Sequence, residues 1–207
     1  MPEEMARESV LADVAPREAH PASAPDVLCE QPFRGYFNLR GDDPGLPATV
    51  AGVLALELPR EANTVSTGEY ISALWLGPDE WLLMTPDERD TDLLQVLRGA
   101  SGDAHFALTD VSSAYTTIRI RGDDAWQTLA KGCTLDLHPG VFGPGRCAQT
   151  LLAKTDVMIQ PLEDVELVGK KLAGEELMDE QSPGFDLIVR RSFADYLWHW
   201  LTDAVIR

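Results

Sequence analysis

Apolar and polar positions along the first half of the chain predict a hairpin followed by a helix. Apolar runs at residues 70–76 and 80–85 flank Gly77-Pro78-Asp79, a combination typical of two strands joined by a tight turn. The stretch DTDLLQVLRGA follows, with leucines and a valine at helical spacing and Gly99 as the stop. The pattern therefore predicts strand, strand and helix in this order.

The second half of the chain repeats similar elements. Ile118 and Ile120 would face one side of a strand over residues 115–121, with a threonine and two arginines on the other side. A helix is predicted between the acidic turn at residues 122–124 and Gly132. A hairpin within AQTLLAKTDVMIQPL, the strand FDLIVRR and the helix SFADYLWHWLTDAV complete the series.

These two groups predict an α+β fold of duplicated strand-strand-helix units with antiparallel sheets. The first unit would cover residues 33–104 and the second residues 105–207. Residues 1–32 contain five prolines and no apolar face, so we expect a flexible N-terminal arm there. Residues 164–184 form an acidic insertion ahead of the last strand, either a short helix or a mobile excursion.

The final helix is predicted to bury one face and to begin at a capping box, with Ser192 as the N-cap and Asp195 three residues later. Apolar residues at helical spacing define the expected core face. They are Phe193, Leu197, Trp200, Leu201 and Ala204.

Two tryptophans of this helix cannot share that face. Each residue turns the helix by about 100°, so Trp198 points about 160° away from Trp200. Either the helix packs on two sides within the fold, or it presents an aromatic side chain to a partner. Aromatic residues beside arginine are typical of interface hot spots, so we predict partner contacts at Arg190, Arg191, Trp198 and Trp200.

Charge and composition narrow the classes of partner. The 207 residues include 17 basic and 34 acidic side chains, a net charge of −17, which disfavours nucleic acid and anionic membranes and suits a basic protein surface. The start of the chain lacks the apolar core of a signal peptide, and no apolar run approaches the roughly 20 residues of a membrane span. We therefore expect a cytoplasmic protein without a membrane partner.

Motifs for catalysis or metal binding are not evident in the sequence. It has no G-x-G-x-x-G, Walker or G-x-S-x-G motif, its four histidines lack metal-ligand spacing, and its three cysteines fit neither a disulfide framework nor a zinc site. Asp110, ahead of the hydroxyl cluster in TDVSSAYT, is the best candidate for a ligand-binding carboxylate. The alternative, which we favour, is an Asx turn in which Asp110 binds backbone N–H groups.

Four segments resemble the gamma subunit of heterotetrameric sarcosine oxidase over about residues 33–205. They are LGPDEWLLM, TDVSSAYTTIRIRGDDA, LAKGCTLDLHPGVFGPGRCAQTLLAKTDVMI and FDLIVRRSFADYLWHWLTDA. The resemblance implies a fold similar to the folate-binding region of aminomethyltransferases, the T-protein of the glycine cleavage system. The chain departs from the family pattern at residues 160–184, where the usual connection is far shorter.

The resemblance also implies a function within a complex of alpha, beta, gamma and delta subunits. That complex demethylates sarcosine oxidatively to glycine, passes the one-carbon unit to tetrahydrofolate and forms hydrogen peroxide. FAD, FMN and NAD would belong to the alpha and beta subunits and zinc to the delta subunit. This chain would then carry no catalytic, cofactor-binding or metal-binding residue and would stabilise the large alpha subunit.

Two alternatives to this interpretation stay open. N-methylglutamate dehydrogenase has a similar subunit, which the quoted segments do not distinguish from the sarcosine oxidase subunit. A stand-alone folate-dependent aminomethyltransferase-like enzyme would instead need a ligand-sized pocket, with Asp110 as its positioned carboxylate.

Overall fold

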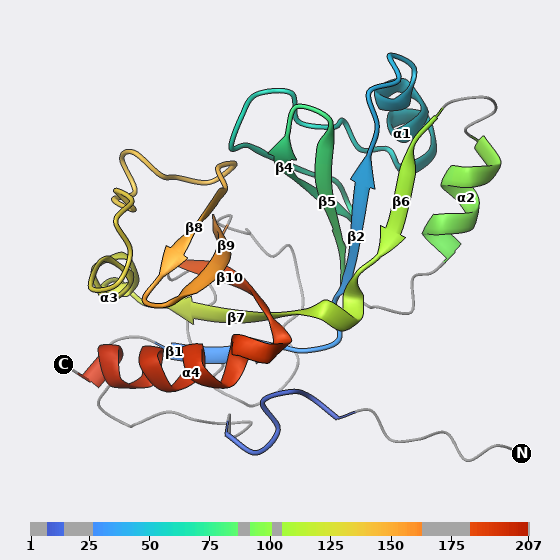
Figure 1. Cartoon of the computed structure of the whole chain (residues 1–207). Helices are drawn as coiled ribbons and strands as arrows, with labels where there is room; N and C mark the ends of the chain where they lie inside the picture. The colour runs from blue at the N-terminus through green and yellow to red at the C-terminus, as the bar shows by residue number, and fades with distance from the viewer. Residues whose placement is uncertain (1–7, 15–26, 87–91, 101–104, 163–182, 207) are drawn as a thin grey trace, which may run out of the picture.

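The computed structural model describes residues 8–14, 27–86, 92–100, 105–162 and 183–206. These residues form two five-stranded antiparallel sheets, each with helices on one face, which confirms the predicted α+β class (Figure 1). In Figure 1 the strands of one sheet run up the view, whereas β7 and β1 of the other run across it. Most of the predicted acidic insertion lies outside the described residues.

The first sheet has the strand order β3-β4-β5-β2-β6. Its strands are β2 (Gly35–Arg40), β3 (Val65–Thr67), β4 (Ser72–Gly77), β5 (Glu80–Thr85) and β6 (Ala107–Asp110). Helices α1 (Leu46–Leu54) and α2 (Asp92–Ala100) close one face, where Leu46 and Leu97 pack against Phe37 and Leu83. The predicted hairpin is β4–β5 and the predicted helix after it is α2, so both are confirmed.

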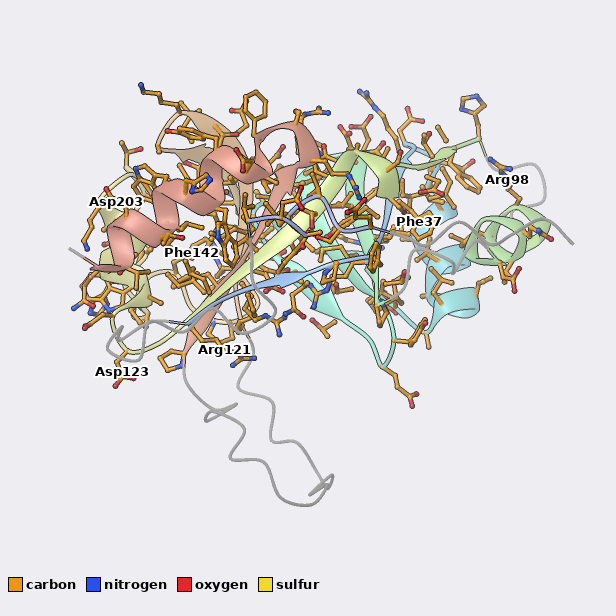
Figure 2. All side chains as sticks on the ribbon, turned by 90° about the horizontal axis from the view of Figure 1, so that it is seen from below. Phe37, Arg98, Arg121, Asp123, Phe142 and Asp203 are labelled. Carbon is orange, nitrogen blue, oxygen red and sulfur yellow. The ribbon has the colours of Figure 1, made fainter. Side chains whose placement is uncertain are left out.

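The second sheet has the strand order β1-β7-β10-β9-β8. Its strands are β1 (Val27–Gln31), β7 (Tyr115–Arg121), β8 (Ala148–Leu152), β9 (Thr155–Pro161) and β10 (Gly184–Arg190). Helices α3 (Ala125–Ala130) and α4 (Arg191–Ile206) close one face, and a short 3₁₀ turn, η1 (Ser112–Ala114), leads into β7. Ile118 and Ile120 are fully buried under the helices, as their alternation predicts. Figure 2 shows Phe142 in this core and Phe37 in the other.

The two sheets correspond strand for strand, but one strand of the second comes from the N-terminus. β1 pairs with β7 at the place where β6 pairs with β2. The expected flexible arm is therefore wrong at residues 27–31, which form β1, and Leu11 is fully buried in the second core. The expected boundary near residue 104 also moves, because β6 still belongs to the first sheet. The backbone groups of β1 are satisfied only by a strand some ninety residues further along the chain, so local sequence did not reveal this pairing.

The two sheets face each other through the sides that the helices leave open. Tyr36, Leu82 and Met84 of the first sheet pack against Met158 and Ile188 of the second. The Tyr36 hydroxyl is 2.7 Å from Thr117 Oγ1, and burial raises the pKa of Tyr36 to about 12. This contact joins the two units into one body.

The outer edges of the two sheets are also linked by backbone hydrogen bonds. Val65 N–H donates to the carbonyl of Gly145, and Cys147 N–H donates to the carbonyl of Asn63, both at 2.9 Å. The segments before β3 and β8 therefore run antiparallel across the junction.

Helix α4 is rotated relative to the orientation that its sequence predicts. Trp198 is 4% exposed and belongs to the second core, whereas Phe193 is 46% exposed. The helix begins at Arg191, directly after β10, so Ser192 lies inside it and does not act as the N-cap. Because the helix continues the strand without a loop, the register of β10 sets which side faces the sheet. The residues that it buries are Ala194, Leu197, Trp198, Leu201, Ala204 and Val205.

Trp200 is half-buried and lies over the backbone at Gly132, so this position has no room for a larger residue. A Cβ atom at Gly132 would come 2.5 Å from the indole ring and 3.1 Å from the Ala153 nitrogen. We expect Gly132→Ala to lower the free energy of unfolding by about 1–3 kcal/mol, because the ring must move out of its packed position. Urea denaturation of the full chain, followed by tryptophan fluorescence, measures the change.

Gly52→Ala is the matched control for this substitution. Gly52 lies in α1, and its Cβ would meet no atom within 4 Å. Alanine at this exposed helical position should raise stability by about 0.5–1 kcal/mol. Equal stability changes in the two variants would contradict the packing of Trp200 on Gly132.

Candidate functional site

The residues predicted to contact a partner lie in different environments. Arg190 is exposed, with its guanidinium 5.4 Å from the centre of the Tyr115 ring, and Arg191 is half-buried. Trp198 is buried in the chain's own core, so the prediction that it contacts a partner is wrong. Trp200 is half-buried at the surface, nine residues and about 13 Å along the axis from Arg191.

An aromatic stripe runs along the exposed side of α4. Phe193, Tyr196 and Trp200 follow one another at helical spacing, within an arc of about 60°. Phe193 is 46% exposed and Tyr196 is 37% exposed. The sequence pattern predicts Phe193 and Trp200 on the core face and does not single out Tyr196; Phe193 is instead exposed. The helical spacing of the three aromatic residues in the sequence indicates that they share one side of the helix. It does not indicate whether that side is buried or exposed.

Asp110 closes a turn at the end of β6. The Ser112 N–H donates to Asp110 Oδ1 at 2.9 Å, and the Ser112 hydroxyl in turn accepts from the Tyr36 N–H at 3.0 Å. This is the Asx-turn arrangement that competes with a ligand-binding role. Asp110 does not line the cavity beside Met84 or the cavity beside Met158.

The most deeply buried charge in the described chain is Asp186 of β10, and the sequence did not single it out. Its side chain is 2% exposed and accepts from two arginines. Arg119 of β7 donates from Nε and Nη2 at 2.7 and 2.9 Å, and Arg34 donates from Nη1 at 2.9 Å. The site therefore holds two positive charges around one carboxylate.

Arg34 reaches this site from the connection between the two sheets. Residues 32–34 carry the chain from β1 in the second sheet to β2 in the first. Phe33 has φ 60°, a left-handed conformation that is unfavourable for a residue with a side chain. The crossover thus brings Arg34 against β10 at a cost in backbone energy that the surrounding contacts offset.

The electrostatics of the site keep Asp186 ionised. Burial by itself would raise the pKa of Asp186, but the hydrogen bonds from Arg119 and the charge of Arg34 outweigh it and hold that pKa below its usual range. Burial disfavours the charged form of Arg119 as well, yet its bond to Asp186 raises its pKa. The two groups stabilise each other's charged forms.

The described residues offer neither a metal site nor a membrane-spanning helix. Among the described residues, no three His, Cys, Asp or Glu side chains lie close enough together to hold a metal ion. The three cysteines form no disulfide, and burial raises the pKa of the Cys147 thiol to about 11. None of the described helices is long and apolar enough to cross a bilayer.

Comparison with known proteins identifies the family. The model of the "Sarcosine oxidase, gamma subunit family" matches residues 40–207. The chain belongs to this family. It is 33% identical over 159 residues to the sarcosine oxidase subunit gamma of Corynebacterium sp. (strain U-96), a match that covers 76% of this chain and 68% of that relative. The gamma subunit of an Arthrobacter species is 30% identical with the same coverage.

Solved structures agree with this family and with the predicted fold. The chain superimposes on heterotetrameric sarcosine oxidase from Corynebacterium sp. U-96, in complex with pyrrole 2-carboxylate, with a TM-score of 0.75 and 28% identity. That match covers 97% of this chain and 95% of the other. The glycine cleavage system aminomethyltransferase T from Bartonella henselae matches with a TM-score of 0.57 over 86% of this gamma-family chain and 45% of the other. At 13% identity, the second match shows a shared fold alone.

The buried charges predict a stability effect that depends on pH. Asp186→Asn should lower the free energy of unfolding at pH 7 by about 3 kcal/mol, because two partly buried arginines lose their counter-charge. The native pKa of Asp186 is depressed, so its contribution is present above the unfolded pKa of about 3.9 and is lost as pH falls through the native value. The difference in the free energy of unfolding between the wild type and Asp186→Asn should therefore become smaller at low pH, as measured by urea titrations.

Asp156→Asn is the control for this prediction. Asp156 lies on β9 with its side chain exposed, so its replacement should change stability by less than about 0.5 kcal/mol. A stability loss in Asp186→Asn that stays constant from pH 7 to pH 3 would refute the assignment of the effect to the carboxylate charge.

Proposed function

We propose that this chain is the gamma subunit of a heterotetrameric sarcosine oxidase complex, that it is itself non-catalytic, and that it binds and stabilises the large alpha subunit. Family membership supports the complex. The exposed aromatic stripe of α4 supports the docking role. Its rings face solvent, whereas the other side of the helix is already buried in the second core.

The stripe has the composition of an interface. Large aromatic side chains lose little conformational entropy on binding and bury much apolar area, so they dominate many interface energies. Arg190 and Arg191 at the start of the helix add donors for carboxylates of a partner. Because Trp198 and Leu197 already pack on the sheet, α4 can hold the stripe in place before a partner arrives.

The chemistry of the proposed complex would belong to the other subunits. FAD, FMN, NAD and zinc would be bound by the alpha, beta and delta chains. Tetrahydrofolate would accept the one-carbon unit from sarcosine, with glycine and hydrogen peroxide as products. The turn contacts of Asp110 favour this division over a stand-alone aminomethyltransferase that would use Asp110 on its ligand.

The docking role is tested with the alpha subunit as the binding partner. Phe193→Ala/Tyr196→Ala should weaken binding of the full chain at least tenfold, because hot-spot aromatics contribute about 2 kcal/mol or more each. Surface plasmon resonance with immobilised alpha subunit measures the affinity. The fold should be retained, since both side chains are exposed.

Val96→Ala on α2 is the matched control. Val96 is 51% exposed and lies on the helix layer of the other sheet, so its loss should leave the affinity unchanged. Equal affinities for the double variant and the wild type would rule out the aromatic stripe as the docking surface.

A further inference from the structure

A cavity of about 290 Å³ adjoins the buried charges and is lined by residues of both sheets. Arg119, Gln160 and Asp186 of the second sheet belong to its wall. Arg121 at the end of β7, labelled in Figure 2, lines it as well. The loop from β3 to β4 and the end of β5 complete the lining. The volume is at the lower limit of those typical of small-molecule sites, so the space suits a small ligand.

The cavity carries more positive than negative charge. Its lining includes three arginines and two carboxylates, namely Arg34, Arg119, Arg121, Glu69 and Asp186. Glu69 is exposed, so water and salt screen its charge, whereas the side chain of Asp186 is 2% exposed. One positive charge is therefore in excess here, although the whole chain has a net charge of −17. Partly buried charge is unfavourable without a counter-charge, so this cavity favours an anion.

Arg34 is the charge that Asp186 does not require. Arg119 already forms a two-point pair with Asp186, from Nε to Oδ1 at 2.7 Å and from Nη2 to Oδ2 at 2.9 Å. Arg34 adds a third bond, to the same Oδ2. Phe33, the residue before Arg34, has φ 60°, so the position of Arg34 is held at a cost in backbone energy. Each guanidinium has five N–H groups, so within the described chain both arginines retain donors for a ligand.

The same wall presents acceptors that need a donor. Gln160 of β9 lies opposite Asp186 of β10, and Gln160 Oε1 is buried without a hydrogen-bond partner among the described residues. A buried acceptor of this kind costs free energy until a donor reaches it. The ionised carboxylate of Asp186 also only accepts. The best ligand is therefore an anion that carries an O–H group of its own.

We propose that this cavity binds inorganic phosphate. Phosphate keeps at least one proton at neutral pH, so a single ion supplies both accepting oxygens and a donating O–H group. Its unprotonated oxygens would accept from N–H groups of Arg34 and Arg119, a pairing that guanidinium favours. Its O–H group would donate to Gln160 Oε1. One ion thus meets the excess positive charge and the unpartnered acceptor together.

The test is isothermal titration calorimetry of the full chain in a chloride buffer at neutral pH, with sodium phosphate and sodium sulfate as titrants. Phosphate should bind with a Kd below about 1 mM. Sulfate has a similar shape but carries no proton, so it leaves Gln160 Oε1 unpaired. It should therefore bind at least about tenfold more weakly.

Two substitutions separate the charge from the acceptor. Arg34→Met removes charged donors and leaves the two-point pair of Asp186 and Arg119 intact. It should weaken the binding of phosphate about tenfold or more. Gln160→Leu removes the buried acceptor, so the preference for phosphate over sulfate should become several-fold smaller. This second variant should fold, because leucine leaves no unpaired polar group in the wall.

Arg40→Met is the control, since Arg40 is exposed, pairs with Asp79 and does not line the cavity. Its phosphate affinity should equal that of the wild type, and a loss as large as that of Arg34→Met would overturn the proposal. Absence of phosphate binding at millimolar concentrations would overturn it as well, as would equal affinities for phosphate and sulfate. The titration uses the chain without the alpha subunit, so its outcome is independent of docking through α4.

Discussion

The face-to-face contact of the two sheets is the constraint on which the rest of this structure depends. Helices close one face of each sheet, so the other face must be buried against a second sheet. Tyr36 and Met84 meet Met158 and Ile188 there, and the Tyr36–Thr117 hydrogen bond satisfies the polar group that this contact buries. The same arrangement creates the space in which Asp186 and its arginines lie.

The crossing of the chain between the sheets adds a second link. β1 belongs to the second sheet and β2 to the first, so neither unit is built from one continuous segment. Arg34 lies in this crossover and donates a hydrogen bond to Asp186 of β10. The bond holds the crossover against the second sheet. An interaction between residues 152 positions apart thereby helps to hold both units in one body.

The two sheets have corresponding strand orders but carry different surfaces. Leu74 and Leu82 of the first sheet pack in the contact between the sheets. In the second sheet, Asp186 carries a charge and Gln160 Oε1 has no hydrogen-bond partner among the described residues. On the outside of the second sheet, α4 buries Trp198 and presents Phe193 and Tyr196 to solvent. A chain of the gamma subunit family therefore combines an inward polar site with an outward aromatic one.

The sequence by itself determined the class of fold, the β4–β5 hairpin, the alternation at Ile118 and Ile120 and the family, because these depend on local spacing and on contiguous segments. Only the tertiary structure decided where β1 pairs, which side of α4 is buried and which arginines meet Asp186. Those outcomes depend on the register between strands distant in sequence. A periodic pattern shows that two faces exist, but the neighbouring strands select the one that is buried.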